Sequence, residues 1–181
     1  MSLYGASVEY GLHCLLYLVD PPEGVRRSSR DLAEFQGISP TFIAKLFTQL
    51  EKVGIVTAAE GVSGGFSLAR PASSISVLDV ADALEGGKPL FQCREVRDRC
   101  VLNDPSKVKI SKRGVCAIHA VMLEGERRMR EALAETSLAD IAGQVAGKQS
   151  ERLVAARRRW FEDRAHSRRT SSRYTPMKEG D

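Results

Sequence analysis

The sequence lacks the features that mark membrane, secreted or catalytic proteins. No apolar run reaches the roughly 18–20 residues that a membrane span needs. The run at 11–19 follows Glu9 and has no positively charged segment before it, so it is not a secretory signal. We also find no glycine-rich phosphate loop, no Ser–His–acid arrangement and no substrate motif. We therefore expect a cytoplasmic protein that is not an enzyme, has no small-molecule substrate and binds no membrane.

Basic residues are scarce in the first 86 residues, which hold 6 Lys and Arg against 10 Asp and Glu. Residues 148–181 instead hold 10 basic and 5 acidic side chains, so this tail accounts for the net charge of +4. Bulk charge is therefore weak support for nucleic-acid binding. An argument for such binding must come from local patterns.

Cysteine is also sparse, with four residues and no Cys-x2-Cys pair. Cys93, Cys100 and Cys116, with His119 three residues further on, offer three thiolates and an imidazole. Such a set suits an iron–sulfur cluster, or zinc in a Cys₃His site. In a reducing compartment clustered cysteines more often bind metal or perform redox chemistry than form disulfides. Unpaired or buried thiols are the alternative interpretation.

The first 86 residues have the pattern of a winged helix-turn-helix. Apolar periodicity and capping residues predict helices over 7–19, 28–37 and 40–53, followed by strands over 55–58 and 66–69. Ser76 and Asp79 are predicted to cap a further helix that runs to about Glu85. Three glycines within the six residues 60–65 suit a hairpin tip that closely approaches another backbone. The predicted fold is mainly α, with a small β-hairpin wing and a long dimerisation helix.

The helix over 40–53 is the predicted DNA-reading helix. Its apolar face holds Phe42, Leu46, Leu50 and Val53. Lysines and threonines on its other face are residue types that contact phosphates and base edges in a major groove. The predicted DNA contacts are Arg26, Arg27, Arg30, Ser39, Thr41, Lys45, Thr48, Lys52, Ser63, Gly64 and Gly65. The alternative is an ordinary solvated helix face in a protein-interaction module that binds no DNA.

The rest of the chain is predicted to form three segments. An irregular cysteine-bearing loop spans 87–115, and a long helix with a shorter one spans 116–147. The apolar stripe of the long helix holds Ile118, Met122, Met129 and Leu133. The basic tail, 148–181, is predicted to be partly disordered, with Ser167–Asp181 unstructured after one weak amphipathic helix.

Glu9 and His13 form a second candidate ligand pair. They lie four residues apart on one side of the first helix. A carboxylate and an imidazole so placed can complete a metal site. Their spacing alone favours the alternative, a pair on the helix surface that makes only a weak contact.

Residues 1–146 resemble the Rrf2 family of bacterial regulators. The resemblance rests on Glu9–Leu12, Ile38–Leu46, Gly64–Pro71, Ile75–Val80 and the three loop cysteines. It implies a homodimer in which the helix over 116–133 crosses between subunits, and paired winged helices that bind a palindromic operator in double-stranded DNA. It also implies an iron–sulfur cluster, [2Fe–2S] in preference to [4Fe–4S], that controls DNA affinity. We expect a repressor that senses redox state, nitric oxide or iron–sulfur supply.

The resemblance also implies which residues hold the cluster. Cys93 and Cys116 match two family ligands, and His119 matches a histidine that ligates in some relatives. Glu9 matches an acidic ligand of others, and Glu9 with His13 matches a ligand pair of a redox-sensing member. Cys100 departs from the pattern because its separation from Cys116 is longer than usual. A zinc-containing or cluster-free regulator of the same fold, switched by a partner protein or by thiol oxidation, is the alternative.

Overall fold

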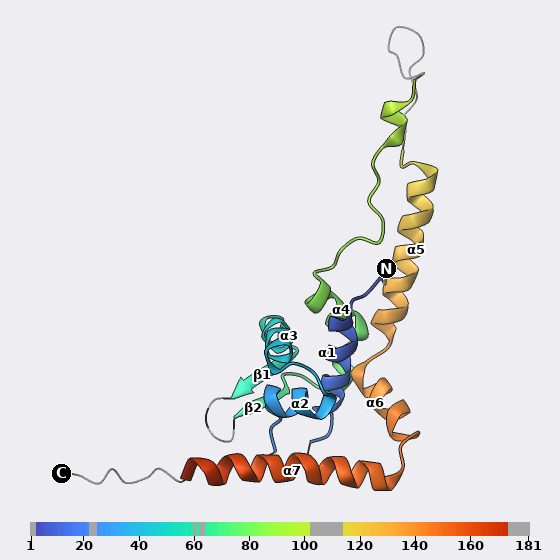
Figure 1. Ribbon diagram of the computed structural model, residues 1–181. Helices are drawn as coiled ribbons and strands as arrows, with labels where there is room; N and C mark the ends of the chain where they lie inside the picture. The colour runs from blue at the N-terminus through green and yellow to red at the C-terminus, as the bar shows by residue number, and fades with distance from the viewer. Residues whose placement is uncertain (1–2, 22–24, 60, 62–63, 102–113, 174–181) are drawn as a thin grey trace, which may run out of the picture.

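The computed structural model describes residues 3–21, 25–59, 61, 64–101 and 114–173. It is mostly helical and contains a two-stranded antiparallel hairpin, as predicted (Figure 1). The elements are α1 (Ala6–Leu16), α2 (Ser29–Gln36), α3 (Pro40–Lys52), β1 (Val56–Ala59), β2 (Gly65–Leu68), the 3₁₀ turn η1 (Ala72–Ser74), α4 (Val77–Glu85), the 3₁₀ turn η2 (Val96–Arg99), α5 (Ala117–Glu135), α6 (Leu138–Ala146) and α7 (Glu151–Arg173).

Helices α2 and α4 begin at the serine caps predicted from the sequence. The Ser28 hydroxyl accepts a hydrogen bond from the backbone N–H of Asp31 (3.0 Å), and α2 ends at Gly37 in the left-handed conformation (φ 66°). At the start of α4, Ser76 and Asp79 each accept a hydrogen bond from the other's backbone N–H. Caps of this kind satisfy backbone donors that have no partner within the helix. They fix where the helices of the winged domain begin.

The wing is tied to the segment before α2 by a backbone bridge. Strand β1 pairs with β2 so that Ala59 lies opposite Gly65. The N–H of Phe66 donates to the carbonyl of Arg27 (2.8 Å), and the N–H of Arg27 donates back to Phe66 (3.4 Å). Gly65 has φ +144°, and a Cβ there would lie 2.8 Å from the Arg27 carbonyl oxygen. The predicted close approach between the glycine segment and another backbone is therefore confirmed.

The hydrophobic core lies between α1, α2, α3, α4 and the wing. Its fully buried side chains include Leu15, Leu32, Ile43, Phe47, Leu50, Ile55, Ile75, Val80 and Leu138. The predicted apolar face of α3 was wrong at Val53, which is 54% exposed because the helix ends at Lys52 and Val53 lies beyond it. Ile43 and Phe47 are buried in its place.

Helix α5 extends away from the winged domain. Its C-terminal half approaches α4, and its N-terminal end lies beside η2 at the far end of the molecule (Figure 1). None of its side chains is buried against the described part of the chain. The long predicted helix is therefore present, and Ile118 and Val121 near its N-terminus are more than two-thirds exposed.

Helix α7 corrects the prediction for the basic tail. It runs without a break to Arg173, so residues 167–173 are helical and the disorder predicted for them was wrong. It lies along the winged domain beside α2 (Figure 1). Phe161 is 2% exposed and packs on Phe35 (ring centroids 4.9 Å apart) and Tyr17 (5.6 Å). This long-range aromatic packing stabilises a helix whose own sequence is mostly polar. Residues 174–181 lie outside the described residues.

Among the helices described, we find none with the length and apolar character to cross a membrane.

Candidate DNA-binding surface and cysteine cavity

The predicted DNA-reading face of α3 is open to solvent. Its exposed side chains are Thr41, Lys45, Thr48 and Lys52. Ser39 is exposed before the helix, and its hydroxyl caps none of the described N–H groups. The Thr48 hydroxyl donates to the carbonyl of Ala44 (3.0 Å), within the helix. The two lysines and the two threonines are therefore all exposed on the predicted face of α3.

The three arginines before and within α2 do not share one environment. Arg26 and Arg30 are exposed, as a phosphate contact requires. Arg27 is 5% exposed, and its guanidinium lies over the ring of Phe161. The prediction that Arg27 contacts DNA was therefore wrong, because α7 covers this side chain. Gly64 and Gly65 lie in the wing, whereas Ser63 lies outside the described residues.

Helix α7 offsets the acidic charge of α2. Arg168 pairs with Asp31, and Arg164 pairs with Glu34. Arg168 also donates to the backbone carbonyl of Arg26 (3.2 Å). The helix carries eight arginines against three acidic residues. The shortage of basic residues in the first 86 positions is therefore partly compensated by a helix far along the chain.

The predicted cluster ligands of the loop line one cavity. Cys93, Cys100, Cys116 and His119 border a space of about 500 Å³, together with Phe91, Arg97 and neighbouring loop residues. Cys93 and Cys116 are half-buried, and Cys100 is exposed. Within the described residues, no group of three or more His, Cys, Asp or Glu has the arrangement of a metal site. The fold thus brings the predicted donors to one cavity without setting them in ligating positions.

The sulfur of Cys116 has an environment that favours the thiolate. Cys116 is the N-cap residue of α5, so its sulfur lies near the first free backbone N–H groups of the helix. The N–H groups of His119 and Ile118 hold the pKa of the Cys116 thiol below its ordinary value, against a smaller opposing effect of desolvation, and Arg97 lowers it further. Thiolate is the form of cysteine that binds metal and reacts as a nucleophile.

Arg97 and Glu95 are residues of the cavity that sequence reasoning missed. Arg97 donates to both carboxylate oxygens of Glu95 (2.9 and 2.8 Å), and the thiol of Cys93 lies 3.5 Å from the same carboxylate. Nothing in the sequence distinguishes Arg97 from the other arginines of this polar loop. Its role becomes visible only when the loop is folded around the sulfurs.

Glu9 and His13 do not belong to this cavity. Both are exposed on α1. Figure 1 shows α1 beside the C-terminal half of α5, whereas η2 and the cysteine loop lie at the opposite end of that helix. Within one chain the structure therefore separates the two predicted ligand sets.

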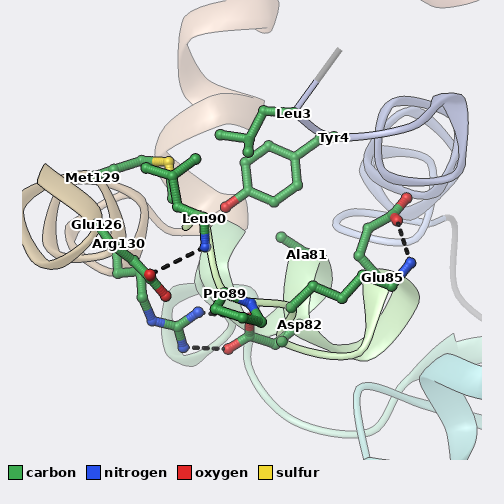
Figure 2. Close-up of a pocket in the computed structure, with 12 residues that line it drawn as sticks. Leu3, Tyr4, Ala81, Asp82, Glu85, Pro89, Leu90, Glu126, Met129 and Arg130 are labelled. Atoms are coloured by element: carbon green, nitrogen blue, oxygen red, sulfur yellow. Dashed lines mark hydrogen bonds and ion pairs between the residues drawn. The ribbon is translucent and has the colours of Figure 1, made fainter. Parts of the chain in front are cut away.

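A small junction connects the cysteine loop to both α4 and α5. Arg130 of α5 donates to both oxygens of Asp82 of α4 (3.0 and 2.7 Å), and the backbone N–H of Leu90 donates to Glu126 of α5 (3.1 Å). The residues that form these bonds line a cavity of about 190 Å³. Figure 2 shows the bonds as dashed lines, with Tyr4 of the N-terminal segment facing Leu90. The start of the loop is thus held to the helix that leads back to the winged domain.

The N-terminal half of α5 carries exposed apolar side chains. Ile118 is 70% exposed and Val121 is 71% exposed, with Leu123 nearby also exposed. Of the predicted stripe, Ile118 is the exposed member, whereas Met122, Met129 and Leu133 are half-buried. Exposed apolar surface of this kind is typical of an interaction site.

Residues 4–144 match the model of the Rrf2 family, described as iron-dependent transcriptional regulators. The chain belongs to the Rrf2 family. Members of this family are DNA-binding transcription regulators and are generally dimeric. The match ends before α7, so that helix is an addition to the family region.

Solved structures of Rrf2 regulators share the fold. CymR, the global cysteine regulator of B. subtilis, aligns with a TM-score of 0.61 at 19% identity, over 80% of this chain and 98% of that chain. IscR of T. potens aligns with a TM-score of 0.62 at 23% identity, over 83% and 92%. The oxidised form of CymR from Staphylococcus aureus aligns with a TM-score of 0.56 at 21% identity, over 78% and 96%. These likenesses confirm the winged-helix fold predicted from the sequence.

Proposed function

We propose that this Rrf2 protein is a homodimeric repressor whose affinity for a palindromic DNA operator depends on an iron–sulfur cluster. The observation that carries the proposal is the shared cavity of Cys93, Cys100, Cys116 and His119 at the N-terminus of α5. The family's description as iron-dependent regulators and the likeness to IscR support it. We assign DNA binding to 1–86, cluster binding to 87–115 and dimerisation to 116–147.

The chemistry of the donors fits such a cofactor. Cysteine thiolates are the usual ligands of iron–sulfur clusters, and the lowered pKa of the Cys116 thiol favours its thiolate. Cys93 and Cys116 would hold the cluster, completed by Cys100 and His119 or by the partner subunit's Glu9 and His13. The carboxylate–imidazole pair favours [2Fe–2S] over [4Fe–4S]. When bound, the cluster supplies a centre that responds to oxidants, nitric oxide or iron supply.

A dimer built on α5 accounts for two features of the chain. Ile118 and Val121 are apolar and exposed, and a second α5 would cover them. Glu9 and His13 are exposed on α1, away from their own cysteine loop, and are therefore accessible to a partner.

The junction in Figure 2 offers a route from the loop to the DNA-reading helix. The Leu90–Glu126 and Asp82–Arg130 bonds link the loop, α5 and α4, and α4 packs on α3. A movement of the loop therefore shifts α5 relative to the winged domain. Because operator half-sites are spaced by the DNA helical turn, a small change in the separation of two α3 helices alters affinity.

Anaerobic purification tests the cluster. We expect a coloured protein with visible absorbance and equal amounts of iron and acid-labile sulfide. Cys116→Ser should lose both, whereas Cys14→Ala should retain them, since Cys14 is buried in the core and lies outside the cavity. A colourless protein with stoichiometric zinc would refute the cluster.

Footprinting on the upstream region of its own gene tests DNA binding. Lys45→Ala and Lys52→Ala should each weaken binding about tenfold, which corresponds to ~1.4 kcal/mol. Lys88→Ala is the matched control, because Lys88 is an exposed lysine that follows α4 in the chain and does not belong to the predicted face of α3. Folded protein without a footprint would instead favour the protein-interaction module.

A regulator switched by thiol oxidation is the second candidate. It is supported by the thiolate-favouring environment of Cys116 in a cavity shared with Cys93, and by the likeness to an oxidised CymR. If the protein is colourless, mass spectrometry after peroxide treatment should find a Cys93–Cys116 disulfide and altered DNA affinity.

A further inference from the structure

A groove of about 430 Å³ lies between the end of α1, α6 and α7. It is separate from the cysteine cavity, and one wall is formed by α7, which lies beyond the family region. Its lining includes Tyr17, Arg27, Val145, Val154, Arg157 and Phe161. The volume lies within the range of small-molecule sites, ~300–1,000 Å³, and aromatic and aliphatic walls are typical of them.

Arg27 contributes a buried and unsatisfied cation to this groove. The residue is 5% exposed, and its Nε and Nη1 atoms have no hydrogen-bond partner among the described residues. The guanidinium lies over Phe161, with Cζ 4.0 Å from the ring centroid. A ring face does not satisfy guanidinium N–H groups, and buried polar groups are nearly always hydrogen-bonded. The Arg27 guanidinium therefore has buried donors that no described residue accepts a hydrogen bond from.

The charged side chains that line the groove are three arginines, Arg27, Arg157 and Arg158, and one carboxylate, Asp20, so cations outnumber anions there. The Nη1 of Arg157 donates to Gln149 (2.8 Å), a neutral partner. Neither Arg27 nor Arg157 forms an ion pair with a described residue. Glu162 is instead paired with Arg158 (3.2 Å). Burial lowers the pKa of Arg27 to about 10; Glu162 opposes this change, and Arg157 and Arg168 add to it.

We propose that the groove binds a small organic anion, a carboxylate attached to an apolar body. The carboxylate accepts hydrogen bonds from Arg27 and lies near Arg157, and the apolar body packs on Tyr17, Val154 and Phe161. A carboxylate is favoured over inorganic phosphate because most of the lining is apolar. Charge-assisted hydrogen bonds of this kind are about twice as strong as neutral ones.

The site goes beyond the proposed function and does not depend on it. A molecule bound in the groove would contact Arg27. The backbone of Arg27 pairs with Phe66 of the wing, and Arg27 directly precedes Ser28, the residue that caps α2. The groove is therefore placed to let a small metabolite act on the geometry of the DNA-binding domain.

Trp160 provides a direct readout of binding. It is the only tryptophan of the chain and packs edge-on against Phe161 (ring centroids 4.9 Å apart). We would titrate full-length protein with phenylacetate and octanoate, and with their neutral amides, following tryptophan fluorescence and calorimetric heat. At least one carboxylate should bind about tenfold or more tightly than its amide, as expected for a hydrogen bond to a charged group.

Variants connect any binding to the groove. Arg27→Gln and Arg157→Gln should each weaken carboxylate binding about tenfold or more. Arg152→Gln, an exposed position on α7 outside the groove, should bind as the parent protein does. Far-UV circular dichroism establishes whether each variant is folded. If Arg27→Gln does not fold, Arg157→Gln alone provides the test. Equal affinity for acid and amide, no binding of either acid, or unchanged binding in folded variants would each overturn the proposal. None of these measurements depends on DNA binding. Footprinting tests the proposed repressor function, so its failure can be distinguished from failure of the ligand site.

Discussion

The guanidinium of Arg27 lies over the ring of Phe161, and this contact joins the segment before α2 to a helix more than 120 positions further along the chain. Phe161 also packs on Tyr17 and Phe35, so its ring is surrounded by α1, α2 and the Arg27 side chain. Helix α7 is therefore a layer of the winged domain. It is not an independent tail.

Replacing Phe161 by alanine tests this packing. We expect the free energy of unfolding to fall by ~3–5 kcal/mol, because a fully buried ring is removed and a cavity remains. Urea denaturation of both proteins gives the difference. The control is Leu153→Ala on the same helix, where the side chain is exposed and the expected change is within ~0.5 kcal/mol. Equal stabilities of Phe161→Ala and the parent protein would show that α7 is undocked in solution.

Gly65→Ala should destabilise the wing. The alanine Cβ would lie 2.8 Å from the carbonyl oxygen of Arg27, at a φ of +144° that residues with side chains rarely adopt. We expect a loss of ~1–3 kcal/mol in unfolding free energy and weaker DNA binding, both measured at one temperature. Gly143→Ala is the control, since its Cβ would meet nothing within 4 Å and helical glycine is less stable than alanine. A Gly65→Ala protein as stable as the parent would contradict the strained geometry.

The winged helix could be predicted because its signals are local. Ser28, Gly37 and Ser76 mark helix boundaries within a few residues of themselves, and glycines mark the wing tip. Val53 was assigned to the buried face of α3 because periodicity does not reveal where the last turn of a helix ends. The prediction that Arg27 contacts DNA was wrong because Arg27 is buried by Phe161, and no local sequence pattern connects these two residues.

The candidate site could be predicted where residue type identifies its members, and not where their importance depends on the folded structure. Cys93, Cys116 and His119 stand out by residue type, and the fold brings them to one cavity. Arg97 does not stand out, because its importance lies in the pairing with Glu95 beside the sulfurs. The groove beside α7 was invisible in the sequence, since three helices that are distant along the chain form it.

Asp79 gives the protein a stability that depends on pH. Desolvation alone would raise the pKa of this carboxyl, but hydrogen bonds from Ser76 and the guanidinium of Arg70 (3.0 Å) together lower it. A lowered pKa stabilises the fold above the unfolded value of ~3.9, and this stability is lost as pH falls through the lower folded value. Asp79→Asn should therefore lose ~0.5–1 kcal/mol at pH 7 and progressively less below about pH 4.

Urea denaturation at pH 7, 5 and 3 measures this dependence on Asp79. Asp163→Asn, at an exposed position of α7, is the control and should change stability little at any of these pH values. A difference between Asp79→Asn and the parent protein that is constant from pH 7 to pH 3 would show that the ionised carboxylate contributes nothing.

If a second α5 covers the exposed apolar face of this helix, as we propose, one charge placed on that face should break the dimer. In a dimer built on this helix, Val121→Glu would bury a carboxylate without a partner, and removing such a charge from water costs several kcal/mol. We expect light scattering to find a dimer for the parent protein and a monomer for Val121→Glu at the same concentration. Leu153→Glu, at an exposed apolar position of α7, should remain dimeric. If Val121→Glu were folded and still dimeric, the subunit contact would lie elsewhere, and the proposal that Glu9 and His13 approach the partner's cysteine loop through this contact would fail with it.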